Sequence, residues 1–221
     1  MIKAVIFDLD GTLCYTINDL RTAMNCMLRE KGYPEMDFAG IYSAINYGSR
    51  EFVRRCLPEG VGDDEELLTE CHRCYSSHYD KHYLDTTYPY EGIVDIISYL
   101  KKENIRVACL SNKADNHVKA IIEKLFPETF DIALGNCERF PTKPNPASAL
   151  WIAEQLKVDT NEVLYIGDSN IDMMTGRNAK FFTCGVTWGY RDRDCLATSG
   201  AQVMIDRALE IKQIIERINN I

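Results

Sequence analysis

The sequence predicts an α/β fold: a doubly wound parallel sheet joined to a smaller, all-α domain. Two observations carry this prediction. From residue 92 onward, apolar runs of strand length alternate with stretches of helical periodicity, which is the pattern of a parallel sheet with helices on both faces. Between residues 14 and 88 the periodicity is helical, with no strand pattern before Pro89, so a helical block interrupts the alternating part near its start.

The first predicted strand is the apolar run at residues 4–7, and the helical block follows it. A helix is predicted at residues 17–28, because apolar residues recur there at helical spacing after a capping-box-like pair, Thr16 and Asp19, and before Gly32. Three further amphipathic stretches, separated by glycine and proline, are predicted as helices at residues 38–45, 49–57 and 64–83.

In the rest of the chain, predicted helices alternate with predicted strands. Helices are predicted at residues 93–102, 118–125, 146–156, 171–179 and 209–218, and strands at residues 106–110, 132–134, 163–166, 181–186 and 203–205. We therefore expect residues 1–13 and 89–221 to form the α/β core and residues 14–88 to form a helical cap.

Composition and charge limit the classes of function. The 221 residues are 46% apolar, enough for one substantial core and a smaller second one, and the net charge of −8 disfavours nucleic acids and anionic membrane surfaces as partners. Because residues 1–13 are predicted to form a core strand and its turn, and no apolar run reaches 18 residues, we expect neither a secretion signal nor a membrane span. Nine dispersed cysteines, an odd number, indicate reduced thiols, so we expect a cytoplasmic protein.

Two acidic residues come directly after the first strand. Asp8 ends the strand, and Asp10 lies in the turn that Gly11 and Thr12 signal. Two carboxylates this close raise each other's pKa, so a cation is expected between them. One carboxylate could attack a phosphoryl group while the other transfers a proton, and Mg²⁺ is the ion that carboxylates and phosphates usually share.

Other polar residues take similar positions. Ser111 and Asn112 follow one predicted strand, Asp168 and Asp172 follow another, and Lys143 stands just before a predicted helix. In an open α/β sheet the functional crevice lies beyond the carboxyl ends of the strands, so we expect these side chains to meet there. Each alone has an ordinary explanation as a cap, a turn residue or a solvated lysine, and their joint order is what indicates a site.

These motifs resemble those of the haloacid dehalogenase-like hydrolase superfamily: Asp-x-Asp-Gly-Thr, then a Ser or Thr, then a Lys, then Gly-Asp-Ser-x-x-Asp. They occur in this order at residues 8–12, 111, 143 and 167–172, and the resemblance covers essentially the whole chain. Thr-Tyr-Pro-Tyr-Glu-Gly at residues 87–92, with Leu-Ser-Asn-Lys and Lys-Pro-Asn-Pro, is most similar to the phosphoglycolate phosphatase-like group. The resemblance implies a mobile helical cap that closes over the phosphate site and contributes to substrate selection.

The resemblance also implies a role for each site residue. Asp8 would attack phosphorus, and Asp10 would protonate the leaving alkoxide and then activate water. Mg²⁺ would be bound by the Asp8 carboxylate, the Asp10 carbonyl and Asp168, with support from Asp172. Three residues would bind the phosphate: Ser111, Asn112 and Lys143. The implied function is a Mg²⁺-dependent phosphatase that hydrolyses a small phosphate monoester, phosphoglycolate-like or a sugar phosphate, through an aspartyl-phosphate.

Two alternative functions stay open. The Gly-Ser-Arg-Glu stretch at residues 48–51 resembles that of β-phosphoglucomutase, so a sugar phosphomutase is the first alternative, and Arg50 is a candidate anion-binding residue of the cap. The second is a non-catalytic phosphoacceptor or binding domain, which needs neither Asp10 nor a cap. The expected partner is a small phosphorylated metabolite, bound by a monomer or a homodimer.

One further cluster could bind a metal ion. A shared helix face carries four possible zinc ligands: Cys71, Cys74, His78 and His82. The same face continues an apolar stripe, which favours a packing role for these residues.

Overall fold

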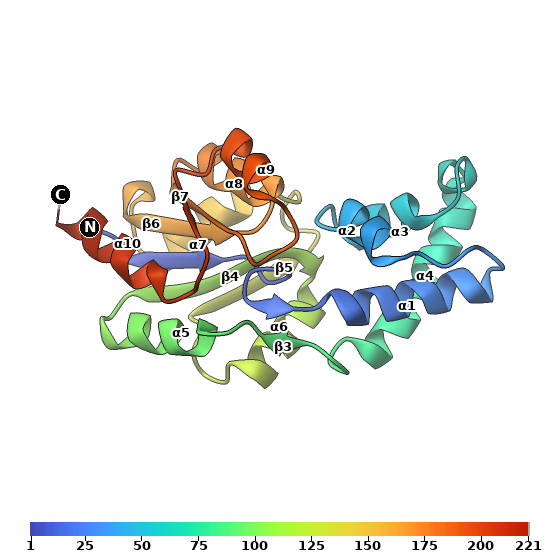
Figure 1. Cartoon of the computed structure of the whole chain (residues 1–221), viewed down its shortest axis with the longest axis horizontal. Coiled ribbons are helices and arrows are strands. Elements are labelled where there is room, and N and C mark those ends of the chain that lie inside the picture. Colours follow the sequence, from blue (N-terminus) through green and yellow to red (C-terminus); the bar gives the residue numbers. More distant parts are fainter. Residues whose placement is uncertain (221) are drawn as a thin grey trace.

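The computed structural model describes residues 1–220 and has a six-stranded parallel sheet at its centre (Figure 1). The strands are β1 (Ala4–Phe7), β4 (Arg106–Ala114), β5 (Ile132–Asn136), β6 (Val163–Gly167), β7 (Phe182–Val186) and β8 (Val203–Ile205). Their order is β5-β4-β1-β6-β7-β8, so the first strand lies in the middle of the sheet. Residue 221, the last of the predicted core, lies outside the described residues.

Helices cover both faces of this sheet. One face packs against α5 (Ile93–Lys102), α6 (Asp115–Leu125) and α10 (Glu210–Asn219), and the other against α7 (Ala147–Leu156) and α8 (Asn170–Asn178), with α9 (Arg193–Ser199) beside α8. Alternate residues of β1 face opposite sides of the sheet, so both sides carry apolar side chains that helices must cover. Val5 and Phe7 pack into one hydrophobic core, and Ala4 and Ile6 pack into the other. A strand buried on both faces needs an uninterrupted apolar run, as predicted.

Between β1 and α5 the chain forms four helices with a hydrophobic core of their own. These are α1 (Ile17–Glu30), α2 (Phe38–Ala44), α3 (Ser49–Cys56) and α4 (Glu65–His82). α1 and α4 pack against each other and extend away from the sheet (Figure 1). The chain enters and leaves this block through a two-stranded antiparallel ribbon, β2 (Cys14–Tyr15) and β3 (Tyr88–Pro89). We refer to residues 14–88 as the cap, and their status as a separate domain stays a prediction.

The predicted fold class is confirmed, and the differences concern the ends of elements and the shortest elements. β4 continues beyond the predicted end at residue 110, so Ser111 and Asn112 belong to the strand. Periodicity does not reveal the ribbon, whose strands have two residues each, or α9, or the 3-10 helices Val61–Asp63 and Thr160–Glu162. Among the described residues, no helix is both long enough and apolar enough to cross a membrane.

Candidate active site

The middle of the sheet brings the predicted residues together. β4, β1 and β6 are parallel neighbours, so their carboxyl ends meet at one edge. Asp8 follows β1, Ser111 lies in the last part of β4, and Asp168 follows β6. All three side chains are buried. The fold alone therefore explains why residues from three distant parts of the chain are adjacent.

Lys143 connects two of the acidic residues. Its buried ammonium donates hydrogen bonds to Asp8 Oδ1 at 2.9 Å, to Asp172 Oδ1 at 2.7 Å and to the Leu110 carbonyl at 3.1 Å. Burial alone lowers the pKa of Lys143, but the charges of Asp172 and Asp8 outweigh burial and hold this pKa well above its usual value. Lys143 is therefore a fixed positive charge beside Asp8.

Local contacts orient Asp168 and Asp172. Asp168 accepts hydrogen bonds from Thr12 Oγ1 at 2.9 Å and from a backbone N–H at 2.8 Å. The Asp172 carboxylate accepts from the Ser169 N–H at 3.1 Å while the Asp172 N–H donates to Ser169 Oγ at 3.2 Å, and these two bonds form the capping box at the start of α8. Asp172 also accepts from the Ser169 hydroxyl at 2.5 Å. A Cβ atom on Gly11 would lie 2.4 Å from the Asp168 carboxylate, so only glycine fits at this position.

The carboxylates of Asp8, Asp168 and Asp172 fit a divalent cation. One oxygen of each lies within 4.8 Å of the others, and all three residues are buried. Burial and the charge of Asp172 raise the pKa of Asp168 to about 7 and raise the pKa of Asp8 well above its usual range. When all four carboxylates, Asp10 included, are ionised, the two lysine ammonium groups leave two negative charges uncompensated. Oxygen ligands with this excess charge are suited to a hard divalent cation.

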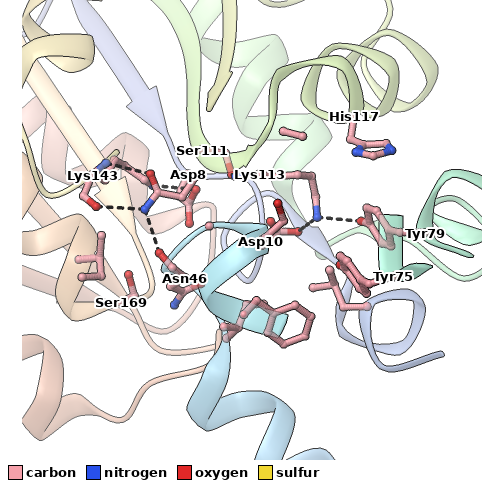
Figure 2. Close-up of a pocket in the computed structure, with 18 of the residues that line it drawn as sticks. Asp8, Asp10, Asn46, Tyr75, Tyr79, Ser111, Lys113, His117, Lys143 and Ser169 are labelled. Atoms are coloured by element: carbon pink, nitrogen blue, oxygen red, sulfur yellow. Dashed lines mark hydrogen bonds and ion pairs between the residues drawn. The ribbon is translucent and has the colours of Figure 1, made fainter. Parts of the chain in front are cut away.

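Asp10 lies in the turn after Asp8 and contacts a different lysine. Its Oδ1 accepts a hydrogen bond from the Thr16 hydroxyl at 2.5 Å and pairs with Lys113 Nζ at 2.9 Å. Lys113 also donates to the hydroxyl of Tyr79, on α4 of the cap, at 2.7 Å (Figure 2). A continuous set of contacts therefore runs from the turn at Asp10, through β4, to the cap.

A cavity lies between the core and the cap (Figure 2). On the core side it is lined by Asp8, Asp10, Ser111 and Lys143, and on the cap side by residues of α1, α3, α4 and the loop between α2 and α3. Both acids of the turn thus face one space that the cap covers. Such a covered space can exclude bulk water from a reactive intermediate.

Ser111 and Asn112 both line the cavity, but the Asn112 side chain already has hydrogen-bond partners. The Asn112 side chain accepts from the Lys143 N–H at 2.8 Å, donates to the Lys143 carbonyl at 3.1 Å, and donates to the Asn46 carbonyl in the cap at 2.9 Å. Its amide therefore holds the backbone of Lys143 and connects core and cap, and binding of the phosphate by Asn112 stays a prediction.

The structure does not bring Arg50 to the cavity. Its guanidinium pairs with Glu65 Oε2 at 2.6 Å and donates to Thr69 Oγ1 at 3.0 Å, on the exposed side of the cap. Ser49, the preceding residue, does line the cavity. Successive helical residues point about 100° apart, so Arg50 points away where Ser49 points inward. We therefore correct the prediction that Arg50 binds the substrate.

The four possible zinc ligands of α4 do not gather into one site. Cys71 is buried in the core of the cap, and His82 pairs with a neighbouring carboxylate at 2.6 Å. Cys74 and His78 lie beside Glu30 of α1 instead, with His78 Nε2 3.0 Å from Glu30 Oε2. The packing role expected for this helix face holds for Cys71.

The cavity residues that the sequence analysis did not predict include Lys113, Tyr79 and Asn46. A signal existed for Lys113, because alternation along an extended β4 places it on the same face as Ser111. Tyr79 belongs to an aromatic series at four-residue spacing, Tyr75, Tyr79 and Tyr83, that marks one face of α4. Asn46 follows α2 with a φ of 90°, and asparagine is one of the few residues that accept this conformation.

The comparisons with known proteins agree with this geometry. The family model described as "Haloacid dehalogenase-like hydrolase" matches residues 5–186. The phosphoglycolate phosphatase of Nitrosospira multiformis is 29% identical, over 98% of this chain and 96% of its own length. The N-acetylmuramic acid 6-phosphate phosphatase of Pseudomonas aeruginosa is 28% identical, also over 98% of this chain and 96% of its own length.

A solved structure gives the same result for the fold. The protein from Lactobacillus delbrueckii subsp. bulgaricus, provisionally described as a phosphoglycolate phosphatase, superposes with a TM-score of 0.91 at 29% identity, covering 96% of this chain and 98% of that one. With the family model matching most of the residues, the chain belongs to the haloacid dehalogenase-like hydrolase family and is an enzyme of the phosphatase type within it.

Proposed function

We propose that this protein is a Mg²⁺-dependent phosphatase that hydrolyses a small phosphate monoester through phosphoryl transfer to Asp8. One observation carries the proposal: the buried Asp8 carboxylate opens onto a covered cavity, with Lys143 2.9 Å away and two further acids within reach of one cation. Phosphoryl transfer depends mainly on positioning and on neutralisation of charge, and this arrangement supplies both.

The residues that would hold Mg²⁺ are Asp8, Asp168 and Asp172, with the Asp10 carbonyl expected from the resemblance. The ion would neutralise charge on the phosphoryl oxygens. The excess of two negative charges in the cluster supports a divalent ion over a monovalent one.

Side chains of the protein would carry out the phosphoryl transfer and the hydrolysis that follows it. Asp8 attacks phosphorus, a bond from phosphorus to Asp8 forms, and the bond to the alkoxide breaks as Asp10 donates a proton to the leaving oxygen. Water then attacks phosphorus and gives a proton to Asp10, which releases Asp8 and inorganic phosphate. Lys143 and the Ser111 hydroxyl line the cavity at Asp8, where they can bind the phosphoryl oxygens.

We also propose that the partner is a small phosphorylated metabolite and that the protein is cytoplasmic. A small phosphorylated metabolite fits a covered cavity in which the Lys143 ammonium lies beside Asp8. All nine cysteines are free, and all lie within the described residues, as a reducing compartment such as the cytoplasm favours.

A panel of phosphorylated metabolites tests the proposal. We expect release of inorganic phosphate that requires Mg²⁺, stops with EDTA and is abolished in Asp168→Asn. Asp194→Asn, at an exposed position of α9, is the matched control and should behave as wild type. Isomerisation of a sugar phosphate without release of phosphate would favour the phosphomutase, and a phosphoenzyme that persists for minutes without turnover would favour the phosphoacceptor domain.

A further inference from the structure

The cap side of the cavity is the region that would contact the leaving group of a substrate. Its large side chains are apolar or aromatic, and its polar ones are neutral: Leu20, Phe52, Tyr75, Asn46, Ser49 and Ser76. Within the described residues 14–88, the cap contributes no charged side chain to this lining. The cap therefore offers surface for an apolar face and hydrogen bonds for neutral groups.

The cations of the neighbouring cap helices are engaged elsewhere. Arg50 and Arg54 both pair with Glu65 at 2.6 Å on the outer side of the cap. On the core side, His117 lines the cavity, but its Nε2 atom lies 2.7 Å from Asp80 Oδ1, and burial lowers its pKa. No arginine of the described chain lines the cavity.

Lys113 is the one remaining cation beside this part of the cavity in residues 1–220, and it is already paired. Its ammonium lies 2.9 Å from Asp10 Oδ1 and 2.7 Å from the Tyr79 hydroxyl (Figure 2). A carboxylate on the substrate would have to compete with Asp10 for this lysine. The competition would disturb the residue that protonates the leaving group, and it would bring a further negative charge to a site that is already acidic.

Asn46 supplies an unused hydrogen-bond donor on the cap side. It lines the cavity, and its Nδ2 atom is buried without a hydrogen-bond partner among the described residues. Its carbonyl is held by Asn112 at 2.9 Å, so its backbone is fixed in the unusual conformation with a φ of 90°. A buried donor without a partner is costly, and a hydroxyl or carbonyl oxygen of a bound molecule would satisfy it.

We propose that the cap side of this cavity is a subsite for an uncharged leaving group that has hydroxyl or amide oxygens and an apolar face. This inference rests on the proposed phosphatase function. It makes the substrate the monophosphate of a neutral alcohol, such as a polyol or a sugar, and not a phosphorylated carboxylic acid or a bisphosphate. The names of the two relatives both specify phosphorylated acids, one of them a sugar acid, so this inference separates the substrate of this protein from both.

Matched pairs of substrates test the subsite in the wild-type enzyme. Phosphoglycolate and 2-hydroxyethyl phosphate differ only by a carboxylate in place of a hydroxymethyl group, and 3-phosphoglycerate and glycerol 3-phosphate differ in the same way. We expect kcat/KM to be higher by about 10-fold or more for the neutral member of each pair, which corresponds to about 1.4 kcal/mol. Equal or greater kcat/KM for the acids overturns the inference while leaving the phosphatase function intact.

A cap variant provides the reverse test. Ser76→Lys adds a cation to the cavity wall, whereas Ser77→Lys adds the same charge at an exposed position of α4. We expect Ser76→Lys to shift the preference toward phosphoglycolate by about 10-fold and Ser77→Lys to leave it unchanged. An equal shift in both variants would mean that net charge, and not this wall, decides the preference.

Asn46→Gly tests the unused donor, because glycine also accepts the φ of 90° at this position. We expect kcat/KM for glycerol 3-phosphate to fall by about 2- to 12-fold, as for loss of one neutral hydrogen bond, with no change for p-nitrophenyl phosphate, which has no hydroxyl group to bind. An equal loss on both substrates contradicts a role in binding the leaving group. A protein that releases phosphate from no monoester would refute the phosphatase function itself, and with it the subsite.

Discussion

Lys143→Met is the substitution that most directly tests the electrostatic account of the site. Methionine keeps the length and the apolar part of the side chain but removes the ammonium that lies 2.9 Å from Asp8 and 2.7 Å from Asp172. Both carboxylates are buried, and Lys143 is 5% exposed, so water cannot replace the lost contacts. The variant therefore leaves buried, like-charged groups without their partner.

The expected loss of folding stability follows from this geometry. Removing one partner of a buried ion pair costs about 3–5 kcal/mol, and one ammonium that serves two carboxylates belongs in the upper part of this range. For a protein of this size each kcal/mol lowers Tm by about 2–4 °C, so a cost of about 4–5 kcal/mol should lower Tm by roughly 8–20 °C without metal. Added Mg²⁺ should recover part of the loss, because binding to the folded state stabilises it.

The assay is thermal unfolding at neutral pH, with EDTA and with Mg²⁺, for a double-mutant cycle. Asp172→Asn in the Lys143→Met background removes one unpaired charge, so the double variant should be more stable than Lys143→Met alone. Strictly additive effects of the two substitutions would refute the reasoning, because they would show that the two side chains do not depend on each other.

Three further predictions concern single residues. Asp10→Asn should lower kcat by about 10²–10⁴-fold, the usual range for general acid–base catalysis, while single-turnover measurements still detect a phosphoenzyme; loss of the phosphoenzyme would contradict a role limited to proton transfer. Burial lowers the pKa of His117, so the unfolded state binds more protons below about pH 6.5, and the free energy of unfolding should fall as the pH falls through this range. Denaturant unfolding of His117→Gln should show a weaker fall, and an unchanged pH dependence would exclude His117 as its source. Arg50→Ala should change kcat/KM by less than about 2-fold for any substrate, because an exposed ion pair contributes little; a selective loss on charged substrates would return Arg50 to the site.

The positions of most site residues in the α/β core could be predicted, because these residues stand at the ends of strands. Asp8, Ser111 and Asp168 each stand at the carboxyl end of an apolar run, and neighbouring parallel strands must place such residues at one edge. Lys143 is different, since it comes from a loop. Its place was expected only from the order of the motifs, and its contacts with Asp8 and Asp172 depend on packing that no local pattern reveals.

The helices of the cap could be predicted from the sequence, but the residues that the cap turns toward the core could not. Helical spacing identifies its four helices, yet which residue faces the core depends on rotation about each axis and on the loop after α2. Arg50 was misplaced because its partner, Glu65, comes from the next long helix. Lys113 was missed because its partner Asp10 lies about a hundred residues earlier in the chain, and only the folded sheet brings the two together.

Rapid-quench trapping with a phosphate-labelled substrate tests the central claim most directly. We expect wild-type protein, stopped in acid within the first turnover, to carry a covalent phosphate that peptide mapping places on Asp8, and we expect Asp8→Asn to carry none. Turnover by the wild type without any covalent phosphate, or a phosphate on another residue such as Ser111, would contradict it.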